Sequence, residues 1–311
     1  MHFVGMLKTT SFALSEGSVY ERLRRHPAIE FDPYIAHASL IYDAQSAAIL
    51  EQVHREYLDI GQRHGVPMFA LTDTWRANQE RVQKSRFHYW DVNQDNAHFL
   101  VRLCNSFGLT ARQIFIGGQV GPRGNAYRPE EAPTRAEAEA FHAPQIVSLV
   151  EGQVDFLYAS TLPALSEAQG IAAAMAITGL PYLLSFVVRQ DGTLLDGTPL
   201  GQAIDVLDFT NPNPPTGYGI NCVHPRTFMS ALNTLDKSHL QRVLSFQANT
   251  FTRNLGEPDQ PTELETEDPN TLADIMMEAY QEFGTLFMGG CHGTDTRHIE
   301  SLARKHRELI Q

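Results

Sequence analysis

Two short stretches of the chain end in residue types that bind metals. The stretch 285–293, TLFMGGCHG, runs from apolar residues through two glycines to Cys291 and His292. Its apolar part is typical of a buried strand, and the glycines let the backbone pass close to a neighbour without a Cβ in the way. Adjacent residues can supply only part of a tetrahedral metal site, so another ligand must come from elsewhere. Cys222, in the stretch 217–225, GYGINCVHP, is the best candidate.

The set Cys222, Cys291 and His292 has the chemistry of a catalytic zinc site. Two thiolates and one imidazole are an accepted set of three zinc ligands, and the fourth position then stays open for substrate. His224 is an alternative third ligand, although Pro225 behind it restricts its backbone. The competing interpretation is that the cysteines are small buried hydrophobes and that His292 is a hydrogen-bonded loop residue.

Other candidate residues have simpler interpretations. Cys104 lies among apolar residues in a helical stretch and is expected to be structural. Glu16 precedes Gly17 just after the first apolar stretch, where it would either bind a substrate amine or cap the helix that follows. We place His298 and His306 on the surface of the last helix.

The elements that position these residues follow a repeated strand–helix order. The apolar patterns predict strands at 11–14, 67–71, 113–117, 154–158, 182–188, 218–221, 242–246 and 285–288. They predict helices at 19–25, 43–64, 93–105, 135–150, 166–178, 201–207, 225–234, 270–283 and 295–309, with a polar loop at 252–268.

Eight strands that alternate with helices favour an α/β fold, a single-domain (β/α)8 TIM barrel over residues 1–311. An open doubly wound sheet is the alternative, but no Gly-x-Gly-x-x-Gly follows the first strand. In a barrel the carboxyl ends of the strands meet at one rim, where active sites lie. The residues expected at that rim are Glu16, Thr72, Asp73, Thr74, Gln119, Ser160, Cys222, Asn249, Cys291 and His292.

Composition excludes several classes of function. The net charge is −12, from 24 Lys+Arg against 36 Asp+Glu, and no basic stripe is present, so nucleic acid is not an expected partner. The first residues lack the apolar core of a signal peptide, and no run approaches the roughly 18 apolar residues of a membrane span. Three widely separated cysteines fit a reducing compartment. We expect a cytoplasmic protein with no membrane partner.

The cysteine stretches resemble those of the homocysteine S-methyltransferase family, which includes betaine-dependent and S-methylmethionine-dependent enzymes and the homocysteine-binding module of cobalamin-dependent methionine synthase. The most specific shared motifs are GINC at 219–222 and GGCHGT at 289–294, and the similarity covers nearly the whole chain. The resemblance implies a barrel that holds zinc by one cysteine in the first motif and two in the second. It also implies that the thiolate of homocysteine takes the remaining zinc position and attacks an activated methyl group.

Three positions depart from the family pattern. Cys222 and Cys291 match family ligands, whereas His292 stands where the third cysteine is expected. This exchange makes the zinc centre one charge less negative, which predicts slower alkyl transfer or a different preferred metal. Ser160 stands where the family commonly has the glutamate that holds the amino group of homocysteine, and Glu16 stands where it usually has aspartate.

The resulting hypothesis is a zinc-dependent methyltransferase that moves a methyl group from an onium donor, S-methylmethionine-like or betaine-like, to a thiol such as homocysteine. Zn²⁺ is expected on Cys222, Cys291 and His292. The residues expected at the substrate are Glu16, Gly17, Thr74, Ser160, Asn221 and Asn249.

Trp75 and Tyr127 would either face the onium group or serve as packing. One alternative is a metal-dependent hydrolase with Glu16 or Asp73 as base, and another is a binding protein without turnover. The expected partners are a small-molecule thiol and a methyl donor, and assembly into a homo-oligomer is compatible with the sequence.

Overall fold

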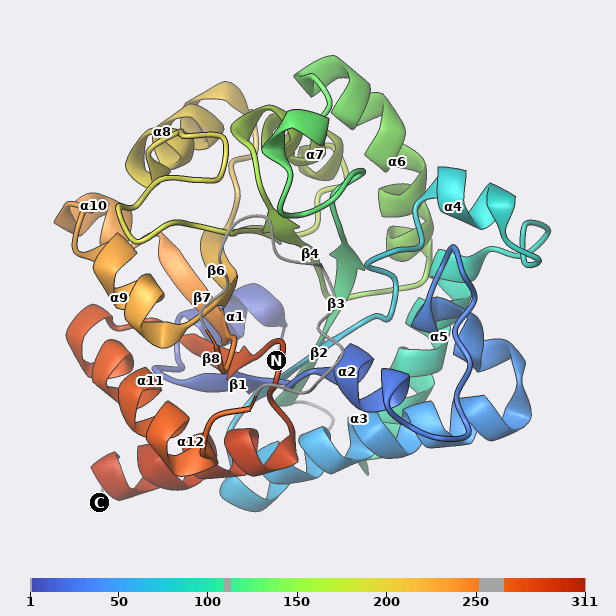
Figure 1. Ribbon diagram of the computed structural model, residues 1–311, viewed down its shortest axis with the longest axis horizontal. Coiled ribbons are helices and arrows are strands. Elements are labelled where there is room, and N and C mark those ends of the chain that lie inside the picture. The colour runs from blue at the N-terminus through green and yellow to red at the C-terminus, as the bar shows by residue number, and fades with distance from the viewer. Residues whose placement is uncertain (1, 109–112, 252–265, 311) are drawn as a thin grey trace.

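Eight parallel strands close into a barrel in chain order, with helices around the outside (Figure 1). The structure, a computed structural model, describes residues 2–108, 113–251 and 266–310. The closed sheet confirms the predicted (β/α)8 TIM barrel, and the open doubly wound alternative is wrong. Most of the predicted polar loop at 252–268 lies outside the described residues.

Five strands, β3, β4, β6, β7 and β8, run two to four residues further toward their carboxyl ends than predicted. As a result, Ser160 and Cys222 lie inside strands instead of in the loops that follow them. The strands are β1 (Ala13–Ser15), β2 (Met68–Leu71), β3 (Ile114–Val120), β4 (Phe156–Leu162), β5 (Tyr182–Phe186), β6 (Gly217–Val223), β7 (Val243–Ala248) and β8 (Phe287–Gly290).

All the predicted helices are present, and the structure also contains short helices that the sequence did not predict. The helices are α1 (Phe3–Leu7), α2 (Val19–Arg24), α3 (Ala44–His64), α4 (Gln79–Lys84), α5 (Val92–Asn105), α6 (Arg135–Glu151), α7 (Leu165–Ala176), α8 (Leu200–Thr210), α9 (Pro225–Leu232), α10 (Lys237–Leu240), α11 (Pro269–Phe283) and α12 (Thr296–Ile310), with 3₁₀ turns η1 (His37–Tyr42) and η3 (Pro129–Glu131). Of the helices in the described ranges, none combines the length and the apolar character needed to cross a membrane.

Helix ends follow local capping signals. The side chain of Asp43 accepts a hydrogen bond from the first turn of α3, and Gly65 ends that helix with a left-handed φ of 65°. Thr134 and Glu137 form a reciprocal capping box at the start of α6. These caps fix where each helix starts relative to the strand before it.

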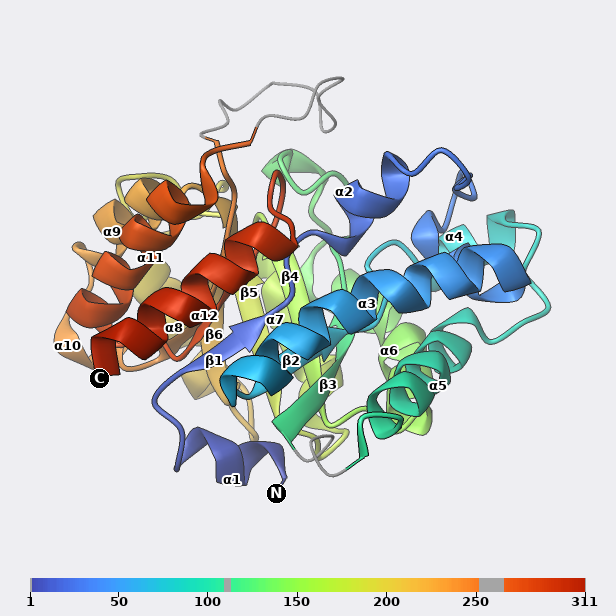
Figure 2. The ribbon, with the colours of Figure 1, turned by 90° about the horizontal axis from the view of Figure 1, so that it is seen from below.

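The unpredicted helix α1 closes the amino end of the barrel. Phe3 stacks on Phe156 with ring centroids 4.3 Å apart, and Phe69 and Phe287 also contact it. Figure 2 shows α1 below the barrel, at the opposite end from α2. The aromatic cluster fills this end with apolar side chains, so a polar site must lie at the carboxyl rim.

Candidate metal centre and substrate cavity

The carboxyl ends of β6 and β8 bring the three candidate metal ligands together. Each of Cys222, Cys291 and His292 offers a ligand atom, and these atoms lie within 4.8 Å of one another. Within residues 2–108, 113–251 and 266–310, this is the one group of its kind. The Cα atoms of the two cysteines are 5.7 Å apart, and the structure joins their sulfur atoms as a disulfide.

The disulfide and a metal site are alternative states of the same two sulfur atoms. A metal binds cysteines as thiolates, so the pair must be reduced before it can act as ligands. Two thiolates and an imidazole, held together by the fold, form a donor set that fits zinc.

Cys222 is aimed at the site by a β-bulge. The register between β6 and β7 pairs Asn221 with Gln247 and Val223 with Ala248, which leaves Cys222 as the extra residue. Its backbone has a left-handed φ of 58°, a conformation that a non-glycine residue rarely adopts. Bulges of this kind re-aim a side chain near an active site, and the rare φ marks a position that the surrounding structure holds in place.

A second bulge, on β4, supports the first. The register with β5 shifts between Ala159 and Leu162, and Thr161 also has a left-handed φ, of 63°. The amide oxygen of Asn221 accepts hydrogen bonds from the Thr161 N–H at 2.9 Å and from the Ser185 hydroxyl at 2.7 Å. Its amide nitrogen donates to Thr161 Oγ1 at 2.7 Å and to the sulfur of the next residue at 3.5 Å. Asn221 therefore fixes both bulges.

Asn249 links the two strands that carry the metal ligands. Its buried side chain donates to the carbonyl oxygen of Cys222 at 2.8 Å and accepts from the backbone N–H of His292 at 3.1 Å. Thr74 is buried in the same way and donates to the carbonyl oxygen of Gln119 at 2.6 Å. Both were predicted to bind substrate, but their side chains bond to backbone groups, and neither lines the cavity at the rim that Glu16 and Ser160 line.

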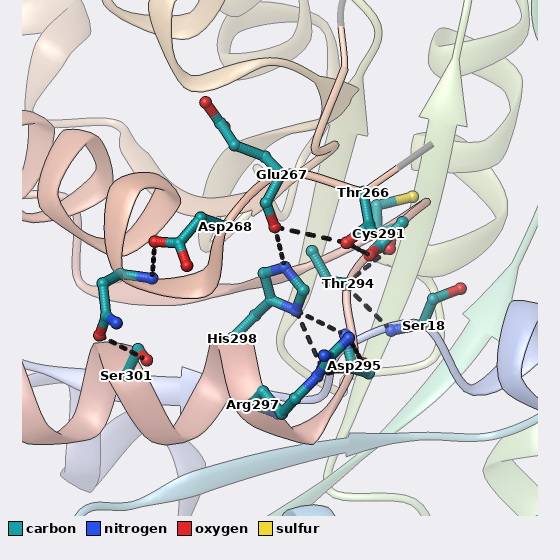
Figure 3. Close-up of polar contacts among 12 residues, drawn as sticks. Ser18, Thr266, Glu267, Asp268, Cys291, Thr294, Asp295, Arg297, His298 and Ser301 are labelled. Atoms are coloured by element: carbon teal, nitrogen blue, oxygen red, sulfur yellow. Dashed lines mark hydrogen bonds and ion pairs between the residues drawn. The ribbon is translucent and has the colours of Figure 1, made fainter. Parts of the chain in front are cut away.

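The two glycines of β8 stand where a side chain would collide with its neighbours. A Cβ on Gly289 would lie 1.8 Å from Ser15 Oγ, and one on Gly290 would lie 2.1 Å from Thr294 Oγ1. The predicted close backbone approach is confirmed. Thr294 Oγ1 also donates to the carbonyl oxygen of Cys291 at 2.7 Å and accepts from the Ser18 N–H at 3.2 Å (Figure 3). The loop after β8 is thus tied to the start of α2.

His298 and His306 are buried, so the prediction that they lie on the surface is wrong. Nδ1 of His298 lies 3.0 Å from a carboxylate oxygen of Asp295, and Nε2 lies 3.1 Å from the carbonyl oxygen of Glu267 (Figure 3). His306 stacks on Phe12 at 3.8 Å, and burial lowers its pKa. Both lie on the buried side of the amphipathic helix α12, about two turns apart.

Two further residues that the sequence singled out lie away from the metal ligands. His224 caps α9, where Nδ1 accepts from the Arg226 N–H at 3.2 Å and Nε2 lies 3.3 Å from Glu267. It does not belong to the ligand group, which removes it as the alternative third ligand. Cys104 is buried in α5, and burial raises the pKa of its thiol, as suits a structural residue.

A cavity of about 150 Å³ opens beside the cysteine pair at the rim. Most strands contribute to its wall. Of the predicted substrate residues it contains Glu16, Gly17, Ser160 and Asn221, and it also contains Asp73, Trp75, Arg76, Gln119, Tyr127 and Gln247.

Below the cavity lies a buried chain of carboxylates and imidazoles. Oε1 of Glu16 lies 2.5 Å from Nδ1 of His54, and Oε2 accepts from the Leu71 N–H at 3.0 Å. Nε2 of His54 lies 3.0 Å from Asp73, whose other oxygen lies 3.3 Å from Nε2 of His37. All four side chains of this carboxylate–imidazole chain, Glu16, His54, Asp73 and His37, are nearly inaccessible to solvent.

The charges in this chain stabilise one another. Burial disfavours the charged form of His54, but the charges and hydrogen bonds of Glu16 and Asp73 outweigh burial and raise its pKa well above the ordinary value. Burial likewise acts to raise the pKa of Asp73, and the two histidines outweigh it and hold that pKa below the ordinary value. The two shifts favour an imidazolium at His54 beside a carboxylate at Asp73. The lowered pKa of Asp73 makes its carboxylate a weak base, which disfavours Asp73 as the base of a hydrolase.

His54 and His37 were not predicted from the sequence. A signal was available for His54, because it falls between Val53 and Tyr57 on the buried face of α3. A histidine in such a position requires polar partners, and a carboxylate at a strand end is the natural one. No comparable signal marks His37, which sits in a 3₁₀ turn.

Comparison with solved structures finds the same fold in other proteins. The metallated form of the homocysteine methyltransferase MmuM from Escherichia coli matches with a TM-score of 0.74 at 20% identity, over 97% of this chain and 98% of that one. The oxidized form of the same protein matches with a TM-score of 0.73 at 20% identity over the same shares. The likeness shows a shared (β/α)8 barrel.

Sequence comparison identifies the family. A family model for homocysteine S-methyltransferase matches residues 13–306, so the chain belongs to that family and is a methyltransferase. Homocysteine S-methyltransferase YbgG of Bacillus subtilis is 25% identical over 285 residues, 84% of each chain. Homocysteine S-methyltransferase of Escherichia coli is 26% identical over 204 residues, 62% of this chain and 63% of its own.

Proposed function

We propose that this methyltransferase depends on zinc and moves a methyl group from an onium donor to a thiol acceptor such as homocysteine. The main support for the proposal is that Cys222, Cys291 and His292 lie together beside a cavity that is also lined by carboxylates. The names of the family and of its relatives supply the thiol acceptor and the direction of the reaction.

Reduced Cys222 and Cys291, with His292, would hold the zinc ion and leave one position for the acceptor. When bound there, zinc lowers the pKa of a thiol, so that the acceptor is a thiolate at neutral pH. Asn221 and Asn249 hold the ligands in place through their hydrogen bonds to Cys222 and His292.

The carboxylates at the cavity floor would receive the ammonium group of the acceptor. Glu16 and Asp73 line the same cavity, Glu16 directly after β1 and Asp73 shortly after β2. Ser160 brings no carboxylate from β4. In this account Asp73, from the end of β2, takes the place of the glutamate that the family commonly has at Ser160.

Methyl transfer then needs only alignment of the two substrates. The acceptor sulfur attacks the methyl carbon, a new C–S bond forms, and the bond between that carbon and the onium atom breaks. The electron pair stays on the donor's sulfur or nitrogen, which leaves neutral, and the thiol proton passes to solvent. Trp75 and Tyr127 line the cavity and present aromatic rings suited to an onium cation. The cavity walls hold donor and acceptor in line.

The proposal is tested by incubating reduced, zinc-loaded protein with S-methylmethionine or betaine, with and without homocysteine. Methionine should form only when donor, thiol and zinc are all present, and Cys222→Ala should abolish its formation. Donor consumption without thiol would indicate a hydrolase instead. Thermal stabilisation by the thiol with no product from either donor would indicate a binding protein and contradict the proposal.

A further inference from the structure

The second ring nitrogen of His292 faces a buried carboxylate. Oε1 of Glu21 lies 3.5 Å from Nδ1 of His292, and the side chain of Glu21 is 4% exposed. Nδ1 is itself buried and makes no hydrogen bond within the described part of the chain. This carboxylate therefore supplies the polar environment of that nitrogen.

Two arginines hold the carboxylate in place. Arg24 donates from Nε to Oε1 of Glu21 at 3.2 Å and from Nη2 to Oε2 at 3.0 Å. Arg25 donates from Nη2 to Oε2 at 3.1 Å. Charge-assisted hydrogen bonds from planar guanidinium groups fix the orientation of a carboxylate as well as its position. These hydrogen bonds therefore fix the position from which Oε1 of Glu21 faces His292.

The helix that carries Glu21 is fastened to the loop that carries His292. The N–H of Ser18 donates to Oγ1 of Thr294 at 3.2 Å and to its carbonyl oxygen at 3.3 Å (Figure 3). The hydroxyl of Ser18 accepts from the N–H of Glu21 at 3.2 Å and so caps α2. One residue thus joins both segments, and the distance between Glu21 and His292 is set by the fold.

We infer that Glu21 is the positioning residue that fits His292 to the metal site in place of a third cysteine. An imidazole binds a metal through one nitrogen, and a carboxylate at the other nitrogen fixes the tautomer and the ring orientation and makes the ligand more basic. With Nδ1 turned to Glu21, Nε2 is the nitrogen left for the metal. A cysteine ligand requires no such partner, so Glu21 matters only because residue 292 is histidine. This inference rests on the proposed function.

A double-mutant cycle tests the inference. Zinc affinity is measured by competition with a chromophoric chelator, under reducing conditions, for the native protein, Glu21→Gln, His292→Cys and the double variant. Glu21→Gln should weaken zinc binding roughly 10- to 100-fold in the native background. It should change binding by less than about threefold with cysteine at 292, because the coupled pair is then absent. Equal weakening in both backgrounds would overturn the inference.

Further measurements separate the other outcomes. Glu21→Asp keeps the charge beside Arg24 and Arg25 but moves the carboxylate away from His292, so its zinc affinity should lie between those of the native protein and Glu21→Gln. This variant tests the inference even if Glu21→Gln folds poorly. The ligand-field bands of bound Co²⁺ should shift on Glu21→Gln in the native background and stay unchanged with His292→Cys. A native protein that takes up no zinc would contradict the proposed function itself. Zinc binding that Glu21→Gln leaves intact would contradict only the role of Glu21.

Discussion

Nδ1 of His54 lies 2.5 Å from Oε1 of Glu16, which joins helix α3 to the end of strand β1 beneath the cavity. On its other side the same imidazole lies 3.0 Å from Asp73, at the end of β2. His54 thus holds two strand ends together through one buried cation. Removing one member of such a group leaves a buried charge without its partner, which is costly in a low-dielectric interior.

Asp73→Asn should therefore destabilise the protein in a pH-dependent way. The pKa of Asp73 is lowered by His54 and His37, so the stabilisation from its ionised form is complete above the ordinary value of 3.8 and is lost as the pH falls below it. We expect the variant to be less stable by about 3 kcal/mol at pH 6, with a smaller difference near pH 3. Urea unfolding at the two pH values measures this, and an equal difference at both would contradict it.

Glu16→Gln should weaken recognition of the acceptor's ammonium group without preventing methyl transfer. A hydrogen bond to a charged group contributes about 1.5 to 3 kcal/mol, so KM for homocysteine should rise about 10- to 100-fold. A thiol of the same length without an amino group serves as the control and should show little change. Equal effects on both thiols would show that Glu16 does not contact the ammonium group.

Asn249→Ala should reduce zinc affinity, because Asn249 connects the backbones of Cys222 and His292. We expect a loss of about tenfold or more, the size typical of groups that orient metal ligands. The matched control is Thr74→Val, which removes a hydrogen bond from an equally buried residue away from the ligands. Both variants should lose about 1 to 3 kcal/mol of stability. Unchanged zinc affinity in Asn249→Ala, or an equal loss in both, would count against this role.

Gly289→Ala should disrupt the rim, whereas Gly65→Ala should be tolerated. A Cβ at 289 would lie 1.8 Å from Ser15 Oγ and 3.0 Å from the carbonyl oxygen of Glu16, so the hydroxyl of Ser15 must turn away and the backbone beside it must shift slightly. We expect a cost of about 2 to 3 kcal/mol and reduced zinc affinity. No atom lies within 4 Å of the Cβ position of Gly65. Gly65→Ala should therefore cost only about 1 kcal/mol of stability, because alanine disfavours the left-handed φ. Equal losses of stability in the two variants, with zinc binding intact, would show that the rim accommodates the added methyl group.

Much of this architecture could be predicted because its signals are local. The helical spacing of apolar residues predicted α3, and a short apolar run that ends in glycines predicted β8. The pairing of Cys222 with Cys291 could be anticipated because parallel strand ends meet at one rim. The packing of Phe3 against the amino end of the barrel could not be predicted, because a short apolar stretch does not reveal which end of a barrel it covers.

The parts of the site that escaped prediction depend on long-range geometry. The bulges at Thr161 and Cys222 leave no sequence signal, because neither residue is a glycine, although both adopt a left-handed φ. Glu21 and His292 meet only because the barrel closes. The histidines at 298 and 306 were misplaced because charged neighbours on α12 obscure its buried face.

Whether the two cysteines and His292 bind zinc is decided by the zinc content of the reduced protein, measured by mass spectrometry beside that of Cys291→Ala. A zinc site on Cys222, Cys291 and His292 requires about one zinc ion per native chain and almost none in the variant, since removing a thiolate leaves too few ligands. A native protein that binds no zinc after reduction and addition of the ion would contradict it. So would a variant that retains the metal.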